Sequence, residues 1–124
     1  MDDPATEEFL SSIHHALRAT RRRHVIRSVH ESDAAMLSVR ELASQIAAIE
    51  HGLPIEQATG EPYRNAYNAL SQTHLPTLAE TGIIIYDPNR QTVSRGGNLQ
   101  LAALLVATNR PTVDILSVER SDEG

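Results

Sequence analysis

The sequence of 124 residues contains no cysteine, no lysine and no tryptophan. Without cysteine the chain has no disulfide framework, no thiolate metal site and no cysteine nucleophile. No run of apolar residues approaches the length of a membrane span. The first residues, MDDPAT, are acidic and polar, unlike a secretory signal. These absences predict a cytoplasmic protein of one domain, long enough to bury a core.

The absence of lysine goes with an acidic charge balance. All 11 basic residues are arginine, against 16 acidic residues, which gives a formal net charge of −5. This composition suggests a protein that works at very high salt, from a haloarchaeon or a virus of such a host. A G+C-rich genome, which favours arginine codons, is the alternative explanation.

Several motifs of enzymes and metal sites are also missing. The chain has neither a G-x-x-x-x-G-K phosphate loop nor a G-x-S-x-G nucleophile elbow. No two of the six histidines show the i, i+4 spacing with a carboxylate that is typical of a zinc-binding helix. The sequence therefore predicts no enzyme, no cofactor and no metal site.

Helical spacing of apolar residues dominates the first half of the chain. The apolar positions of a first helix, within residues 1–19, are Phe9, Leu10, Ile13 and Leu17. A second helix, or a continuation of the first, is expected over residues 20–31, followed by a short strand at Met36 and Leu37.

The next helix has the clearest boundaries. Ser38 and Glu41 form the S-x-x-E pattern of a capping box in front of an apolar run. Gly52, with Pro54 just after it, ends the helix.

The second half predicts a helix followed by a β-hairpin. After a loop over residues 52–62, helical spacing runs from Tyr63 to a C′ glycine at Gly82. Pro76 lies inside this helix and predicts a kink or short break near Thr73.

Strands are expected at residues 83–86 and 91–94, on either side of a turn at residues 87–89. Asn98 is expected to cap a last helix, which Asn109 and Pro111 end. The order predicts a mainly α protein with a small β-hairpin (α+β), in the plan of a winged helix-turn-helix with extra N- and C-terminal helices. That domain spans residues 20–96, and residues 97–110 and 111–124 form a C-terminal helix and an acidic tail.

One stretch makes a family resemblance specific. Residues 74–83, HLPTLAETGI, resemble the H-L-x-x-L-x-x-x-G-[LI] signature of arsenical-repressor-type winged-helix regulators. The wider stretch of residues 18–86 resembles a haloarchaeal winged-helix family of largely unassigned function. Its pieces are RATRRRHVIRSV, LASQIAAIEHG and HLPTLAETGIIIYD. The resemblance implies a DNA-binding regulator, but metal sensing is not carried over because the cysteine ligands are absent.

The helix before the hairpin is the expected recognition helix, entering the major groove of double-stranded DNA. Asparagine and glutamine pair with adenine edges and arginine with guanine. Its candidate contact residues are Arg64, Asn65, Asn68, Ser71, Gln72 and Thr73. Candidate phosphate or wing contacts are Arg21, Arg22, Arg90 and Arg95. The alternative for the run of arginines at 21–23 is a solvated helix face.

The net charge of −5 argues against DNA binding at ordinary salt. At about 1 M salt the Debye length is only about 3 Å, so this objection weakens. A protein-interaction module that has lost DNA binding is the alternative function. The two hypotheses differ in one expectation: for DNA binding, arginines 18, 21–23, 64, 90 and 95 converge on one side. A small-molecule sensor, the third possibility, needs a polar-lined cavity.

The last helix is apolar nearly all round, and a small domain buries only one face of it. Its unburied leucines predict an isologous homodimer formed with the first helix. The expected dimer residues are Phe9, Leu10, Ile13, Leu17, Leu101, Leu104 and Leu105. The alternative is that the two helices cover each other within one monomer.

Overall fold

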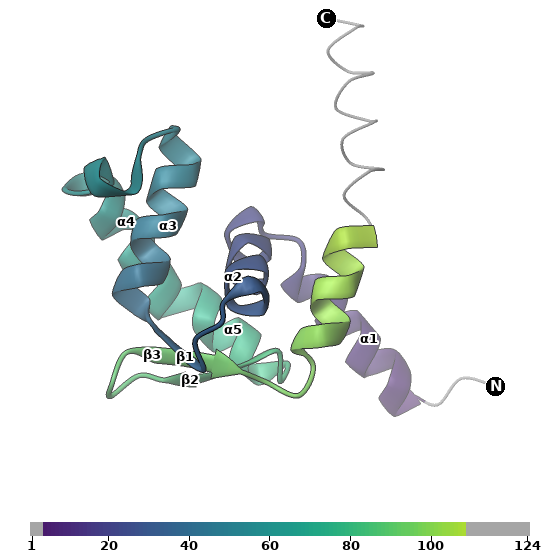
Figure 1. The fold of residues 1–124 in the computed structure, drawn as a ribbon. Coiled ribbons are helices and arrows are strands. Elements are labelled where there is room, and N and C mark those ends of the chain that lie inside the picture. Colours follow the sequence, from purple (N-terminus) through teal and green to yellow (C-terminus); the bar gives the residue numbers. More distant parts are fainter. Residues whose placement is uncertain (1–3, 109–124) are drawn as a thin grey trace, which may run out of the picture.

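A computed structural model describes residues 4–108 of the chain, as a bundle of helices packed on a small sheet (Figure 1). Its elements in chain order are α1 Pro4–Ala16, α2 Thr20–Glu31, β1 Met36–Ser38, α3 Val39–His51, the 3₁₀ turn η1 Ile55–Gln57, α4 Glu61–Ala69, the π-helical segment η2 Leu70–His74, α5 Leu75–Glu80, β2 Ile84–Asp87 and β3 Thr92–Arg95. Residues 99–108 form one more helix. We call residues 61–80 the recognition helix and residues 84–95 the wing.

The sheet has three antiparallel strands in the order β1-β3-β2. In its inner row, Val93 pairs with Leu37 on one side and Tyr86 on the other, and Val93 and Leu37 are buried. In the outer row, Ser94 pairs with Met36 and Ile85, which are both exposed. The predicted hairpin between Gly82 and Gly96 is confirmed, and the fold is α+β with a winged-helix layout.

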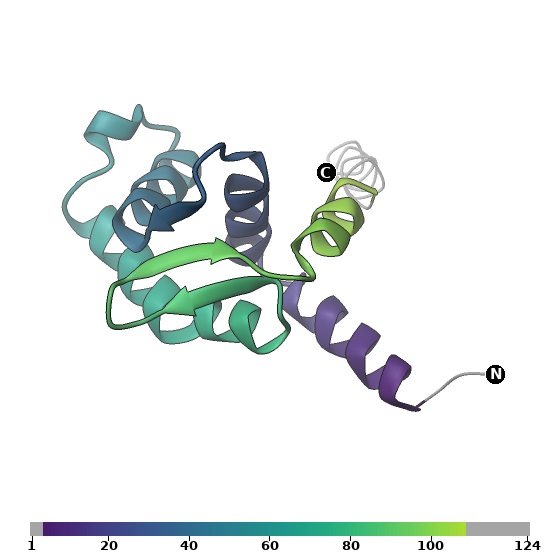
Figure 2. The same cartoon turned by 60° about the horizontal axis from the view of Figure 1, so that its bottom comes forward.

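The core lies between the sheet and helices α2, α3 and the recognition helix (Figure 2). Its largest fully buried side chains include Ile26, Leu42, Ile46, Leu70, Leu75, Leu78 and Ile83. The two leucines of the HLPTL stretch, Leu75 and Leu78, are therefore core residues, as expected from their spacing.

Local sequence signals set both ends of α3 and the end of the recognition helix as predicted, whereas the recognition helix begins at Glu61, before the predicted start at Tyr63. The Ser38 hydroxyl accepts a hydrogen bond from the Glu41 backbone N–H at 3.0 Å, which caps α3. Gly52 ends α3 with a left-handed backbone (φ 62°). Gly82 (φ 73°) ends the recognition helix in a Schellman motif, in which Ile83 N–H donates to the Leu78 carbonyl.

Pro76 widens the recognition helix rather than breaking it. Proline has no N–H, and its ring collides with the carbonyl four residues earlier in a regular helix. Here the turn before it is π-helical, and Leu75 N–H donates to the Leu70 carbonyl five residues back. The predicted kink near Thr73 is thus a π turn inside a continuous helix.

The terminal helices flank the body at one end. Residues 4–12 of α1 are all exposed, and Figures 1 and 2 show this part of α1 extending away from the sheet. In the helix of residues 99–108, Leu99, Ala102 and Val106 are buried along one face. Instead of capping this helix, the Asn98 side chain donates from Nδ2 to the Thr81 carbonyl at 2.8 Å.

The predicted helix end at Asn109 and Pro111 and the acidic tail of residues 111–124 lie outside the described residues. Within residues 4–108, no helix is long and apolar enough to cross a membrane.

Candidate nucleic-acid interface

A row of exposed polar side chains runs along the recognition helix. Asn65, Asn68 and Gln72 are three and four residues apart, so they share one face of α4 and η2. This polar stripe consists of Arg64, Asn65, Asn68, Gln72 and Thr73, which are all exposed. The opposite face carries Ala66 and Leu70, both fully buried, so the core dictates which side of the helix is presented to solvent.

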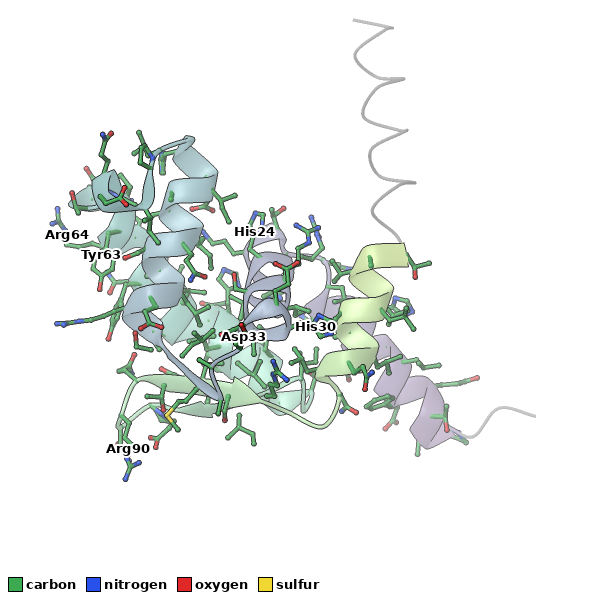
Figure 3. The ribbon with its side chains drawn as sticks, viewed as in Figure 1. His24, His30, Asp33, Tyr63, Arg64 and Arg90 are labelled. Carbon is green, nitrogen blue, oxygen red and sulfur yellow. The ribbon has the colours of Figure 1, made fainter. Side chains whose placement is uncertain are left out.

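Arg64 and the wing tip lie on the same side of the molecule. Arg64 projects outward from the start of α4, and Arg90 projects from the tip of the wing below it (Figure 3). Both are at the end of the body remote from α1. The Asp87 carboxylate accepts hydrogen bonds from the backbone N–H groups of Asn89 and Arg90 and so holds the wing tip in a tight turn.

Ser71, a predicted DNA contact, instead forms a hydrogen bond within the protein. Its hydroxyl donates to Gln91 Oε1 at 3.1 Å and is half-buried between the recognition helix and the wing. Tyr67, on the previous turn, donates from its hydroxyl to the same oxygen at 3.0 Å. Ser71 is therefore engaged within the protein, and we leave it out of the polar stripe.

The predicted phosphate contact by Arg22 is wrong, because the Arg22 side chain is buried. Only 7% of Arg22 is exposed, and its guanidinium donates to the carbonyls of Ala16 and His15 at 2.7 and 3.1 Å. Arg21 forms a two-pronged ion pair with Glu50, at 2.7 and 3.0 Å. Arg95 donates to the Ser32 carbonyl at 2.5 Å and ties β3 to the end of α2.

The arginines consequently do not converge on one side. Consecutive residues on a helix point about 100° apart, so the run of arginines at 21–23 faces three directions. Arg23 closes the end of α1 through the Leu17 and Arg18 carbonyls. Of the predicted set, Arg64 and Arg90 are the two that project together at the wing end.

The predicted dimer residues divide into two groups. Ile13 and Leu17 are buried within the monomer, because the end of α1 packs into the core. These two residues are corrected from interface to core. Leu105 is half-buried, and the exposed remainder are Phe9, Leu10, Leu101 and Leu104. The two terminal helices thus leave part of their apolar surface uncovered in the monomer.

Behind the polar stripe, His74 contacts the buried Arg22. The distance between Arg22 Nη1 and His74 Nδ1 is 3.3 Å. Arginine only donates hydrogen bonds, so Nδ1 is the unprotonated nitrogen of a neutral ring. Burial first, and then the charges of Arg22 and Arg21, lower the pKa of His74, while Glu50 opposes this shift.

The pKa of His74 predicts a loss of stability in weak acid. An unfolded histidine has a pKa of about 6.5, so below that pH the unfolded chain binds more protons than the folded protein. The free energy of unfolding is therefore highest above about pH 6.5 and falls as the pH approaches the lower folded pKa. Burial and Arg27 also lower the pKa of His24, which adds to the same fall.

Urea unfolding at about pH 7.5 and about pH 5.5 measures this fall. His74→Asn keeps an acceptor near Nδ1 and is expected to reduce the difference between the two pH values. Arg21 lowers the pKa of Glu50, so the Glu50 carboxylate is protonated only in stronger acid. The two pH values therefore leave the Arg21–Glu50 ion pair unchanged. If the difference in unfolding free energy between the two pH values were the same in His74→Asn as in the wild type, His74 would not be the cause of the fall.

A hollow of about 440 Å³ lies between α1 and α5, and its lining includes His14, His15, Arg18 and Glu80. All four of these side chains are exposed. Ligand pockets instead cover most of the surface of their ligand. The hollow therefore does not supply the enclosed polar cavity that a small-molecule sensor requires.

Gln91 is the structurally important residue that the sequence pattern missed. Residues 91–94 were expected to be a strand, but β3 begins at Thr92 and Gln91 is a turn residue with φ 54°. Among residues 4–108 it has the one positive φ outside glycine. A positive φ is expected for glycine or asparagine, so no local signal distinguished this glutamine.

Comparison with known proteins places the chain in a family. Residues 14–94 match the family described as a domain of unknown function, DUF7344. Neither the curated proteins nor the solved structures gave a significant match. The matched region runs from the last turn of α1 into β3 and contains nearly all of the winged-helix body. Because it covers well over half of the sequence, the chain belongs to the DUF7344 family.

Proposed function

We propose that the protein is a cytoplasmic, DNA-binding transcriptional regulator that acts as a homodimer, with its recognition helix in the major groove and its wing on the backbone. The observation that carries this proposal is the polar stripe, an exposed row of side chains on the helix that precedes the wing. A major groove about 12 Å wide admits one helix, and the base edges there carry a complete donor and acceptor code.

The chemistry of the stripe suits base recognition. The amides of Asn65, Asn68 and Gln72 each offer a donor and an acceptor, which is what the edge of adenine requires. Arg64, beside them, suits a phosphate or a guanine. Arg90 on the wing is placed for a phosphate that flanks the groove.

The charge of the site favours binding at high salt. Glu61 lies one helical turn before Asn65 on the same face and balances the charge of Arg64. With few net cations, non-specific attraction to phosphates is weak and salt costs little affinity. This arrangement fits the halophilic origin that we infer from the lysine-free, acidic composition.

A protein-interaction module is the second candidate, and the scattered arginines favour it. Arg21, Arg22 and Arg95 are all engaged within the protein rather than free for phosphates. However, the exposed residues of the stripe are polar, whereas the centre of a protein interface is enriched in apolar and aromatic side chains. The composition of the stripe favours DNA.

Selection from a randomised double-stranded library at high salt tests the proposal. The wild-type protein is expected to enrich one sequence, and Asn68→Ala or Gln72→Ala should each cost about 1–3 kcal/mol and relax preference at one base pair. Gln100→Ala is the matched control, since Gln100 is an exposed amide on the helix of residues 99–108. Enrichment of no sequence, or equal effects of all three variants, would refute DNA recognition by the stripe.

A further inference from the structure

The Gln91 side chain makes four hydrogen bonds, two to the recognition helix and two within the wing. Gln91 Oε1 accepts from the hydroxyls of Tyr67 and Ser71, at 3.0 and 3.1 Å. Gln91 Nε2 donates to the Tyr86 hydroxyl at 3.1 Å and to the Pro88 carbonyl at 2.8 Å. An amide side chain has two acceptor sites and two donors, so its capacity is fully used.

The orientation of this amide follows from its partners. The Pro88 carbonyl only accepts hydrogen bonds, so the NH₂ group must face it. The oxygen then faces Tyr67 and Ser71, both of which donate through their hydroxyls. A glutamate of the same length keeps the acceptors but has no donor for Tyr86 or Pro88.

The backbone of Gln91 makes a third connection. Its carbonyl accepts a hydrogen bond from Val39 N–H, at the first residue of α3, at 2.9 Å. Its left-handed φ of 54° costs a residue other than glycine roughly 1–2 kcal/mol. Such a conformation persists only where the surrounding structure holds it, and functional sites are where it concentrates.

We propose that Gln91 is a positioning residue for DNA recognition, holding the wing tip at a set place relative to the polar stripe. Arg90, the adjacent residue, is then placed on a phosphate while Asn68 and Gln72 contact bases. The inference rests on the proposed function. It adds the contact that fixes the position of the wing relative to the recognition helix when both bind the duplex.

Gln91→Gly is the first test, because glycine adopts the positive φ without strain and removes the four side-chain contacts. In the free protein, the backbone N–H groups of Asn89 and Arg90, at the wing tip, are expected to exchange with deuterium faster. Gln91→Glu loses only the two side-chain donors and should also make these N–H groups exchange faster. It replaces Gln91→Gly in the experiment if the glycine variant folds poorly.

The DNA test uses the duplex selected by the wild-type protein and the dependence of its affinity on salt. One phosphate contact contributes about 0.9 to the slope of log affinity against log salt. Arg90→Ala removes one phosphate contact from each protomer of the proposed dimer, so it should lower the wild-type slope by about 1.8. Gln91→Gly should do the same. In the Gln91→Gly background, Arg90→Ala should have no further effect, while Gln72→Ala should cost as much as in the wild type.

The outcomes separate the two proposals. A wild-type protein that selects no duplex contradicts the proposed function and, with it, the positioning role. A wild-type protein that binds, with an Arg90→Ala effect that persists in Gln91→Gly, contradicts the positioning role alone. The positioning role is supported if Gln72→Ala costs the same affinity in the wild type and in Gln91→Gly, while Arg90→Ala has no effect in Gln91→Gly. General destabilisation by Gln91→Gly would also reduce the contribution of the polar stripe.

Discussion

Replacing Arg22 by methionine is expected to lower the free energy of unfolding by about 2–4 kcal/mol. The Arg22 guanidinium joins three elements, with donors to the carbonyls of His15 and Ala16 at the end of α1 and to His74 in the recognition helix. Methionine fills a similar volume but leaves the Ala16 carbonyl and His74 Nδ1 without their donor, whereas the His15 carbonyl keeps its hydrogen bond from the Arg18 backbone N–H. Unsatisfied buried polar groups cost about 1–3 kcal/mol each.

Urea unfolding measures this loss through the transition midpoint at constant slope. Arg27→Met is the matched control, because Arg27 lies on the same helix, is half-buried and has no hydrogen-bond partner among residues 4–108 in the structure. A difference between the two variants of less than about 0.5 kcal/mol would contradict the role of Arg22. His74→Leu, which removes the acceptor for Arg22, should cost less in the Arg22→Met background than in the wild type, since the contact between the two residues is already lost there.

Replacing Leu104 by glutamate is expected to convert the proposed homodimer into a monomer. Leu104 is 62% exposed on the helix of residues 99–108, and Phe9, Leu10 and Leu101 are the other exposed apolar side chains of the terminal helices. Large apolar side chains that stay exposed on both terminal helices are the basis of the proposed interface. A carboxylate buried without a partner in such an interface should weaken association by roughly a hundredfold or more.

Light scattering at high salt and micromolar concentration measures the mass of each protein. Ile85→Glu is the matched control: Ile85 is 61% exposed, but it lies on β2, on the outer face of the sheet, and not on either terminal helix. It should remain dimeric. A monomeric wild-type protein, or dissociation by both variants alike, would contradict the proposed dimer. Loss of the dimer should also weaken binding to the selected duplex, because paired half-sites lie about 34 Å apart.

The sequence by itself determined the order of the elements and several of their ends. Ser38 caps α3, and Gly52 and Gly82 end their helices because only glycine adopts the left-handed backbone there without strain. These signals act over a few residues, so they are legible without tertiary structure. The same is true of the hairpin, where β-branched and aromatic residues next to a polar turn specify the strands locally.

The face on which each polar residue lies was decided by the tertiary structure. Arg21, Arg22 and Arg23 look alike in sequence, but the packing of α2 rotates Arg22 into the core and Arg21 toward Glu50. Whether Ile13 and Leu17 are buried likewise depended on how the end of α1 packs against the rest of the protein. No local pattern specifies the rotation of a helix about its axis to within one residue, because packing against neighbouring elements sets it.

The contacts between distant segments were also beyond the sequence. Gln91 meets Tyr67 and Ser71 across 24 and 20 residues of chain, and Arg22 meets His74 across 52. Each contact exists because the core brings together elements that share no local signal. The helix and hairpin of the candidate interface were therefore predictable, whereas the side chains that hold them in one register were not.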